Sequence, residues 1–415
     1  MKENFDVIVV GGGPAGMMAA GRAAELGKRV LLLEKNNDLG NKLKITGGGR
    51  CNVTNAEADL HRLLSNYGKA KDFLFSPFSR FGVKDVFNFF ESRGLPLVTE
   101  ARQRVFPSTQ KAADVFRVLE KYTEKGKVVL KKGNPVTEII VENKRVSGVI
   151  CGGVKYTASN FVLATGGISA PKTGSTGDGF SWLAKLGHTV NKPNPSIVPL
   201  KVKESWVKKL SGVSLSFMKI TFFQNGQKQF TRKGKILFTH FGLSAPLILN
   251  SAYLVRELLP YGPVDSLIDM YPDTNLGSLE KTVIKVFDKN KNKDLKNIIA
   301  EIVPDGMDPA VISLIGTDLA SKKTHSVTRE ERKKIVHLLK AMPLTVTSLM
   351  GYDRAVISDG GVVLQEVDMR TMRSQLYENL YVIGDLLNIN RPSGGFSLQL
   401  CWTTGYLAGD NAAKM

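Results

Sequence analysis

The sequence contains little cysteine and no long apolar run. Its 415 residues include only three cysteines, Cys51, Cys151 and Cys401, which lie far apart and form no Cys-x-x-Cys pair. A dithiol redox centre and a four-cysteine zinc site are therefore excluded, and no spacing of histidine, cysteine and carboxylate residues indicates another metal. No stretch approaches the roughly 18 uninterrupted apolar residues of a membrane helix, so we expect no membrane association.

The opening segment also lacks the features of a secretory signal. Residues 1–6 are partly acidic and run straight into an apolar segment, without a basic region or a cleavage site. Together with the scarcity of cysteine, this predicts a cytoplasmic protein. The length predicts two or three domains at roughly 100–200 residues each, and 42% hydrophobic residues with a mean hydropathy of −0.08 predict a large buried core.

Acidic residues are few relative to basic ones. Lys and Arg total 57 and Asp and Glu total 38, which gives a net charge of +19 and a pI of about 9.7. This balance carries no information on the fold, but it bears on partners. A generally basic proteome explains it, and so does a polyanionic partner. Nucleic acid ranks ahead of a membrane because no amphipathic anchor is evident.

The first 35 residues carry a nucleotide-binding pattern. Phe5–Val10 is a short apolar run typical of a buried parallel strand, and Gly11–Gly16 follows with the spacing G-x-G-x-x-G. Met17–Leu26 is rich in alanine and predicts a helix. Val30–Leu33 predicts a second buried strand, which ends at Glu34. This order of strand, glycine turn, helix, strand and acid is the dinucleotide-binding arrangement.

Each part of this pattern has a physical role. Gly11 permits the tight turn, Gly13 lets the backbone approach a pyrophosphate, and Gly16 lets the helix pack closely on the strand. The helix N-terminus attracts the diphosphate, and Glu34 accepts hydrogen bonds from the adenosine ribose. A carboxylate there repels a 2′-phosphate, so the nucleotide is FAD or NAD rather than NADP. The predicted contacts in this region are Gly11, Gly13, Pro14, Ala15, Gly16, Glu34 and Lys35.

Two distant segments favour FAD over NAD. Phe161–Gly167 is a strand that ends in an Ala-Thr-Gly turn, and Leu380–Asp385 is a strand that ends in Gly-Asp. With the N-terminal pattern, in this order, they resemble the FAD domain of glutathione-reductase-like flavoproteins. The resemblance implies that Asp385 binds the ribityl chain. No second G-x-G-x-x-G occurs, so a separate NAD(P)H domain is not supported.

Further motifs extend the resemblance over essentially the whole chain. They are Asn41–Asn55, Phe238–Ser244, Ser358–Val362 continuing through Glu366-Val367 to Thr371–Ser374, and Gly394–Gln399. This set resembles the bacterial BaiN/YhiN-like flavoproteins, also described as the aminoacetone-oxidase family or NAD(FAD)-utilising dehydrogenases. Departures occur at Ser244-Ala245-Pro246, Asn390-Arg391-Pro392 and Gly395-Phe396-Ser397. The further cofactor contacts that the resemblance implies are Lys42, Gly48, Gly49, Arg50, Thr165, Gly166, Asp178, Gly384, Asp385, Gly394, Gly395 and Phe396.

Because the cofactor motifs lie near both ends of the chain, the middle is predicted to be an insertion. The expected fold class is α/β, a Rossmann-like FAD-binding domain of the glutathione-reductase type with an inserted β-rich domain and a small helical domain. Asn225-Gly226 predicts a hairpin turn in the β-rich part. The expected ranges are 1–190 with 353–415 for the FAD-binding domain, 191–260 with 341–352 for the β-rich domain, and 261–340 for the helical domain.

The insertion carries two basic stretches. Over residues 201–240, nine basic residues face a single acidic one, Glu204. A solvated surface explains either stretch alone, whereas basic residues in both halves favour a polyanion. The candidate RNA contacts are Lys208, Lys209, Arg232, Lys233 and Lys235. The second stretch comprises Lys289, Lys291, Lys293, Lys296, Lys322, Lys323, Arg329, Arg332, Lys333 and Lys334.

A flavin exchanges hydride at N5, so the protein must supply position, electrostatics and a proton. The N–H groups of Gly394 and Gly395, before a helix expected from Leu398, are placed to stabilise negative charge on the reduced ring. Cys51 and His240 are the candidate proton donors, with packing roles as the alternative for each. Arg50 holds a substrate oxygen or the FAD diphosphate. These three are the candidate catalytic residues, with NAD(P)H as the expected reductant.

The resemblance implies three substrate classes: a uridine of large-subunit ribosomal RNA, oxo-bile-acid enones, and small amines such as aminoacetone. The charge favours RNA, because counterion release gives affinity for any phosphate chain. We therefore expect reduction of a uridine to dihydrouridine. No sequence stretch interleaves aromatic and basic residues as an RNA-stacking surface does. A small-molecule oxidoreductase is the alternative, and a non-catalytic FAD-dependent sensor is the third interpretation.

Overall fold

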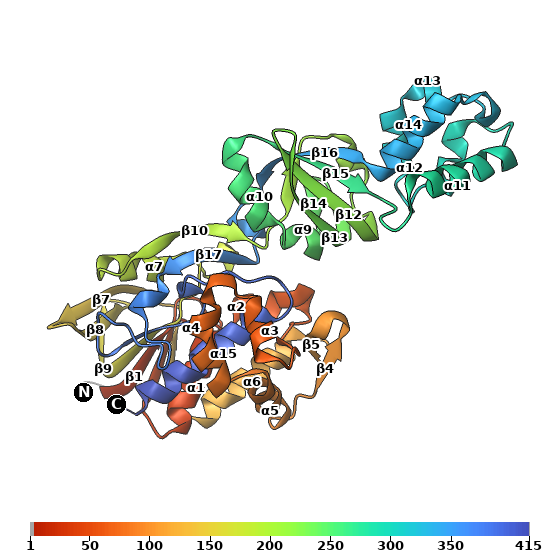
Figure 1. Ribbon diagram of the computed structural model, residues 1–415. Coiled ribbons are helices and arrows are strands. Elements are labelled where there is room, and N and C mark those ends of the chain that lie inside the picture. Colours follow the sequence, from red (N-terminus) through yellow and green to blue (C-terminus); the bar gives the residue numbers. More distant parts are fainter. Residues whose placement is uncertain (1–3, 415) are drawn as a thin grey trace. The chain divides into compact units, whose positions relative to one another are not determined.

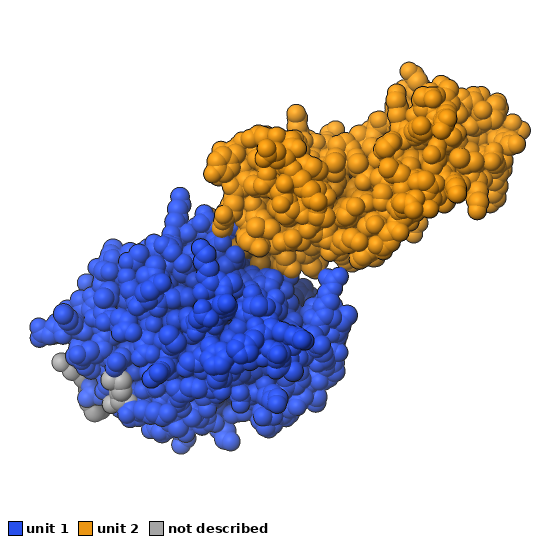
Figure 2. Space-filling model, in the orientation of Figure 1, with its two compact units in different colours: residues 1–195, 355–415 blue, residues 196–354 orange. Residues whose placement is uncertain are grey.

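The structure, a computed structural model, describes residues 4–414 and contains two compact units. Unit 1 comprises residues 1–195 and 355–415, and unit 2 comprises residues 196–354 (Figure 2). The expectation of no secretory signal concerns a segment that begins with Met1, Lys2 and Glu3. These three residues lie outside the described residues. No helix in the described range is both long and apolar enough to cross a membrane.

Unit 1 is built on a seven-stranded mixed sheet (Figure 1). Its strand order is β6-β2-β1-β9-β8-β7, with β18 also paired to β9. The pairs β6–β2, β2–β1, β1–β9 and β9–β18 are parallel, whereas β7–β8 and β8–β9 are antiparallel. The strands are β1 Asn4–Val10, β2 Val30–Glu34, β6 Val129–Lys132, β7 Val136–Glu142, β8 Arg145–Cys151, β9 Val154–Leu163 and β18 Leu380–Val382.

Smaller sheets and helices complete unit 1. The three-stranded sheet contains β3 Thr54–Asn55, β4 Leu97–Glu100 and β5 Arg104–Pro107, and β10 Val190–Ser196 pairs with β17 Ile357–Val362. The helices are α1 Pro14–Glu25, α2 Asn41–Ile45, α3 Leu60–Ser65, α4 Lys71–Arg80, α5 Val83–Glu91, α6 Ala112–Lys125, α7 Asp178–Lys185 and α15 Phe396–Ala412.

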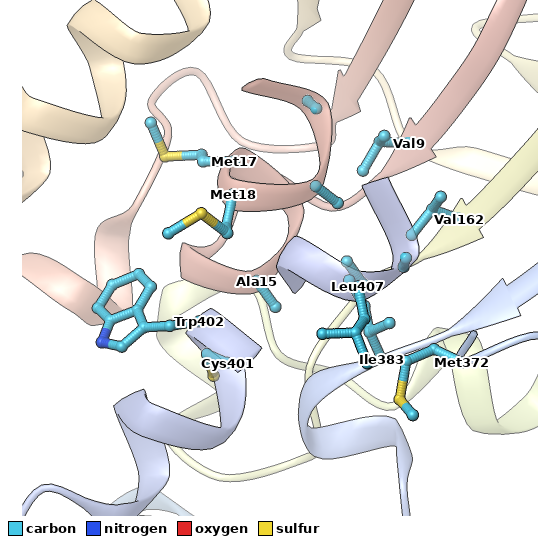
Figure 3. Close-up of a cluster of buried hydrophobic side chains, with 14 of the residues drawn as sticks. Val9, Ala15, Met17, Met18, Val162, Met372, Ile383, Cys401, Trp402 and Leu407 are labelled. Carbon is cyan, nitrogen blue, oxygen red and sulfur yellow. The ribbon is translucent and has the colours of Figure 1, made fainter. Parts of the chain in front are cut away.

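Helix α1 packs closely against α15, although the two lie at opposite ends of the chain (Figure 3). A Cβ atom added to Gly405 of α15 would lie 2.5 Å from the carbonyl oxygen of Ala15, and one added to Gly409 would lie 2.4 Å from that of Ala19. Such separations are far below van der Waals contact, so only glycine permits this approach. The i, i+4 spacing of the two glycines places both on the same face of α15.

Unit 2 contains a closed barrel with strand order β11-β14-β13-β12-β15-β16, in which β16 pairs back to β11. The strands are β11 Leu200–Val202, β12 Ser214–Gln224, β13 Gln227–Thr239, β14 Gly242–Ser244, β15 Val264–Asp269 and β16 Met342–Leu349. The helices are α8 Trp206–Lys209, α9 Pro246–Leu249, α10 Ala252–Leu258, α11 Leu276–Lys289, α12 Asp308–Ile315, α13 Thr317–Ala320 and α14 Arg329–Lys340.

The predicted hairpin at Asn225-Gly226 is confirmed. Both residues have positive φ, +50° and +75°, and they connect β12 to β13 through the Gln224–Gln227 pair. Positive φ at both central positions is the requirement of the tight hairpin turn that matches strand twist.

The prediction that residues 261–340 are helical is wrong for 264–269, which form barrel strand β15. Ser266 points into the barrel and donates a hydrogen bond to the carbonyl of Leu344. A polar residue at an inward position breaks the apolar alternation by which a strand is recognised. The expected separation of a β-rich and a helical domain also differs from the structure, in which both belong to unit 2 and the boundaries fall at 195/196 and 354/355.

We predict that Gly405→Ala destabilises the protein by about 1–3 kcal/mol, the usual effect of overpacking. The added methyl group meets backbone atoms of α1, which cannot rotate away. Gly277→Ala is the matched control, since it also lies in a helix but its Cβ would meet nothing closer than Asn275 Oδ1 at 3.6 Å. Urea unfolding followed by circular dichroism measures both variants, and equal midpoints would contradict the packing argument.

Candidate FAD-binding site

The carboxyl ends of three parallel strands lie side by side in unit 1. Val10 of β1 pairs with Leu163 of β9, which pairs in turn with Val382 of β18. The segments that follow these strands therefore emerge at one edge, although the strand ends are 153 and 219 residues apart in the sequence. In open α/β sheets, ligands bind outside this edge. The three segments that carry the predicted cofactor contacts, which start near Gly11, Thr165 and Gly384, all leave the sheet at this edge.

The turn between β1 and α1 has the geometry of a diphosphate cradle. Gly11 has φ +108°, and a Cβ there would lie 2.5 Å from the carbonyl oxygen of Ala164. A Cβ on Gly16 would lie 1.9 Å from the oxygen of Gly11. By contrast, nothing lies within 4 Å of a Cβ built on Gly13, the N-cap of α1. Packing thus requires glycine at positions 11 and 16, whereas Gly13 leaves open space at the N-terminus of α1.

Glu34 ends β2 beside this turn. Its Oε2 accepts the Gly12 N–H at 2.8 Å, and its Oε1 accepts the backbone N–H of Asn36 at 2.9 Å. These bonds fix the carboxylate in the orientation that faces the edge of the sheet. Asn36 Nδ2 also donates to Oε1, at 2.8 Å. A carboxylate offers about four lone-pair positions, so one position on Oε2 remains for a ribose hydroxyl, and a second hydroxyl would have to displace the Asn36 amide.

A pocket adjoins Glu34 and gathers several of the predicted contacts. The Thr165 hydroxyl in its wall is buried and has no hydrogen-bond partner among the described residues. Lys35 and Asp178 form an ion pair of 2.6 Å in the same wall. The lining residues are Val10, Gly11, Leu33, Glu34, Lys35, Asn134, Val136, Thr165, Gly174, Asp178 and Trp182.

A second polar cluster forms around Asp385, just after β18. The Arg391 guanidinium, whose side chain is 1% exposed, pairs with Asp385 through Nη2 and donates to the carbonyl of Ile389 and the hydroxyl of Ser397. Burial disfavours the Asp385 carboxylate, but the positive charges of Arg391 and Lys42 outweigh it and hold the pKa of Asp385 below its usual value. Burial lowers the pKa of Lys42, and Asp385 partly offsets this.

The Arg391 contact was not predicted. The sequence shows Asn390-Arg391-Pro392 only as a departure from the family pattern, and an ion pair between the 3-10 turn Gly384–Leu386 and the loop after it has no sequence signature. The departure marks the position of Arg391 but does not identify Asp385 as its partner.

The glycine-rich Asn41–Asn55 block packs on the start of α15. Asn55 Nδ2 donates to the carbonyl of Gly394 at 3.0 Å, and a Cβ on Gly395 would lie 2.2 Å from backbone atoms of Thr54. Helix α15 begins at Phe396, two residues before the expected start at Leu398. Gly48 and Gly49 are exposed, with positive φ and nothing within 4 Å of a built Cβ.

The three candidate catalytic residues do not share one environment. Cys51 is fully buried with φ +61°, and burial raises the pKa of its thiol to about 12. Arg50 pairs with Glu100, donates to Gln110 and stacks on the Phe106 ring. His240 belongs to unit 2 and is exposed. Arg50 and Cys51 belong to unit 1.

Ser374, His188 and Glu366 reproduce the connectivity of a hydrolytic triad. His188 Nδ1 lies 3.0 Å from Glu366 Oε2, and its Nε2 lies 3.0 Å from Ser374 Oγ. Both Ser374 and His188 are buried, however, and Ser374 Oγ also accepts the N–H groups of Leu376 and Tyr377. Burial lowers the pKa of His188, although Glu366 raises it in part. These hydrogen bonds stabilise the loop before β18. They give the Glu366 to Ser374 motif a structural role.

These features fit FAD. The adenosine half requires an acceptor for the ribose, a glycine cradle and a pocket for the base, for which Glu34, Gly13 and the Thr165 wall are the candidates. The flavin half requires polar groups for the ribityl chain and backbone N–H groups near the ring, for which Asp385 and Gly395 are the candidates. When bound, FAD supplies hydride exchange at N5. No group of three potential metal-ligating side chains occurs within residues 4–414.

The fold and site define a Rossmann-type FAD-dependent oxidoreductase, and comparison with known proteins specifies the family. The chain belongs to the HI0933-like family, since the family model described as "HI0933-like protein Rossmann domain" matches residues 5–411. The predicted family, the FAD cofactor and the fold class, a Rossmann-type FAD-binding fold with an added β domain and helices, are confirmed.

Two full-length relatives have different names. The chain is 28% identical over 412 residues to the 3-dehydro-bile acid delta(4,6)-reductase of Clostridium scindens, covering 98% of both chains. It is 26% identical over 414 residues to the ribosomal RNA dihydrouridine synthase of Haemophilus influenzae, again covering 98% of both. A flavocytochrome c3 fumarate reductase has a similar fold, with a TM-score of 0.56, 17% identity and coverage of 99% of this chain and 78% of that one.

We predict that Glu34→Arg weakens FAD binding at least about tenfold, because hydrogen bonds to a charged group contribute roughly 1.5–3 kcal/mol. Glu34→Gln, which keeps the shape and one acceptor oxygen, should weaken it less. Glu124→Arg on the exposed face of α6 makes the same charge change away from the residues that line this pocket and serves as control. Titration of the apoprotein with FAD measures the dissociation constants of all three variants. An unchanged dissociation constant for Glu34→Arg would show that Glu34 does not bind the ribose.

Proposed function

We propose that the chain reduces the C5=C6 double bond of a uridine in large-subunit ribosomal RNA to give dihydrouridine. This bond is conjugated to the C4 carbonyl, so it accepts hydride at C6 and a proton at C5. NAD(P)H is the proposed hydride source. One uridine, one NAD(P)H and one proton then give one dihydrouridine and one NAD(P)⁺. Unstacking the base costs on the order of a few kcal/mol, which the phosphate contacts must offset.

The observation that carries the proposal is the charge on residues 201–240. The single acidic residue, Glu204, has both carboxylate oxygens within 3.0 Å of the Thr345 N–H and is engaged there. Lys208, Lys209 and Lys235 are exposed and take part in no ion pair within the described part of the chain. Unpaired lysines attract a phosphate chain and release its counterions on binding.

The second basic stretch contributes less to this argument. Lys322 pairs with Glu331, and Lys323 pairs with Asp294 at 2.8 Å. Residues 289–334 contain seven acidic residues beside their ten basic ones, so the net charge of this stretch is small. We therefore propose that the RNA path follows the barrel residues Lys208, Lys209, Arg232, Lys233 and Lys235.

His240 is the proposed proton donor. Its ring is exposed. The Cys51 thiol, by contrast, is fully buried, and burial raises its pKa to about 12, so it gives up a proton less readily. We propose that Cys51 packs beside the cofactor. We propose that Arg50 leaves its ion pair with Glu100 and binds a substrate oxygen.

We predict that His240→Gln lowers the rate of uridine reduction by about 10²-fold or more, the usual contribution of a positioned acid. Its FAD content should stay unchanged. Cys51→Ser should keep the rate within a few fold. Mass spectrometry of dihydrouridine formed in a ribosomal RNA transcript gives the rates, and flavin absorbance gives the FAD content. The reverse ranking of the two variants would assign the proton to Cys51.

We predict that Lys208→Glu/Lys209→Glu weakens RNA binding and makes its salt dependence shallower. For a single strand the log–log slope is about −0.7 per neutralised phosphate, so losing two contacts should change it by roughly 1.4. Lys121→Glu/Lys125→Glu on α6 makes the same change in net charge in unit 1 and is the matched control. Equal slopes for the two double variants, or no detectable RNA binding at low salt, would contradict the proposed path.

A small-molecule oxidoreductase is the second candidate, which the full-length similarity to a bile-acid reductase favours. An enone and a uracil ring are both hydride acceptors conjugated to a carbonyl, so the same flavin chemistry serves both. Efficient turnover of an enone or a small amine, unaffected by the lysine reversals, would establish this candidate. Turnover of any substrate would exclude the FAD-dependent sensor.

A further inference from the structure

A β-bulge interrupts the pairing of β12 with β13. Leu215 pairs with Ile236, and the next pair is Met218 with Gly234. Ser216 and Phe217 therefore oppose one residue, Lys235, between these pairs. The pairs on either side are buried, whereas all three residues of the bulge are exposed. A bulge of this kind re-aims a side chain and often lies near a functional site.

The bulge directs an aromatic ring toward solvent among basic residues. The Phe217 side chain is 47% exposed. The Lys233 ammonium lies 5.7 Å from the centre of the Phe217 ring and 3.3 Å from Asp273 Oδ1. Lys235 occupies the facing position of the bulge and forms no ion pair within the described residues. We call Phe217, Lys233 and Lys235 the Phe217 patch.

The Phe217 patch combines the two elements with which proteins bind single-stranded nucleic acid. An exposed ring offers a face on which any base stacks, and adjacent lysines attract the flanking phosphates. Without the bulge, the alternation of β12 would place one of Ser216 and Phe217 inside the barrel. The sequence shows no such platform, because the ring lies on one strand and the lysines lie on the next.

We propose that Phe217 stacks on an unpaired base of the bound RNA while Lys233 and Lys235 contact the phosphates beside it. This inference rests on the proposed RNA substrate and adds a base-stacking contact to the electrostatic path. The patch is basic, apart from the single Asp273 contact, so its charge complements a phosphate chain. A second copy of this chain, also strongly basic, is disfavoured as its occupant.

Binding of single-stranded oligomers to the FAD-loaded protein tests the inference. The probes are an oligouridylate of about twelve nucleotides, within the usual site size, and an oligomer of the same backbone and length without bases. The variants are Phe217→Ala, Phe217→Trp and the double reversal Lys233→Glu/Lys235→Glu. Phe75→Ala is the matched control, because Phe75 is 45% exposed and lies on α4 in unit 1.

Phe217→Ala is expected to weaken oligouridylate binding about 5- to 100-fold, the range for losing one stacked base. Its salt slope and its binding to the abasic oligomer should stay unchanged, and Phe217→Trp should restore affinity. The double reversal should weaken both oligomers, and Phe75→Ala neither.

The outcomes distinguish failure of RNA binding from failure of base stacking. If wild-type protein binds neither oligomer at low salt, the proposed function fails, and the stacking contact fails with it. If wild-type protein binds both oligomers with a salt dependence but Phe217→Ala matches it, stacking is overturned and the RNA path stands. Equal weakening of both oligomers by Phe217→Ala, without rescue by tryptophan, also overturns stacking. Loss of a wild-type dimer in Phe217→Ala, measured by sedimentation, would assign the patch to self-association instead.

Discussion

The close approach of backbones around α1 is the constraint on which the cofactor site depends. Gly16 lies against the carbonyl of Gly11, and Gly405 lies against that of Ala15, at distances that no larger residue permits. Arg22 and Asp410 add an ion pair of 2.6 Å between the same two helices. Because α1 is held on both sides, its N-terminus stays at the edge of the sheet where we predict the diphosphate contacts. The first and last segments of the chain therefore form one site.

The two halves of this site use charge differently. Around Glu34 the hydrogen-bond partners are neutral N–H groups, two from the backbone and one from the Asn36 side chain, and the carboxylate keeps one acceptor position for a ligand. Around Asp385 the partner is a buried cation, Arg391, and Lys42 adds a second positive charge. A buried carboxylate without such partners would take up a proton. We therefore attribute to Arg391 a role in keeping Asp385 ionised and oriented, as the predicted ribityl contact of Asp385 would require.

The parts that were predictable from the sequence are those encoded by local spacing. The G-x-G-x-x-G turn, its flanking strands, Glu34 and the Asn225-Gly226 hairpin each combine a short pattern with a backbone requirement. Features that depend on distant partners were not predictable. Strand β15 is not predictable because Ser266 faces the barrel interior. The Arg391–Asp385 pair is not predictable because it joins a 3-10 turn, Gly384–Leu386, to the loop that follows. The Phe217 patch has no sequence pattern, since its ring and its lysines lie on neighbouring strands.

The central claim is that this FAD-dependent oxidoreductase acts on a uridine of ribosomal RNA. Mass spectrometry of nucleosides from large-subunit ribosomal RNA, prepared from strains with and without the gene, tests it most directly. The account predicts that one dihydrouridine is lost on deletion and regained with the wild-type gene, but not with Glu34→Arg. An identical dihydrouridine content in the two strains would contradict the claim and favour a small-molecule substrate.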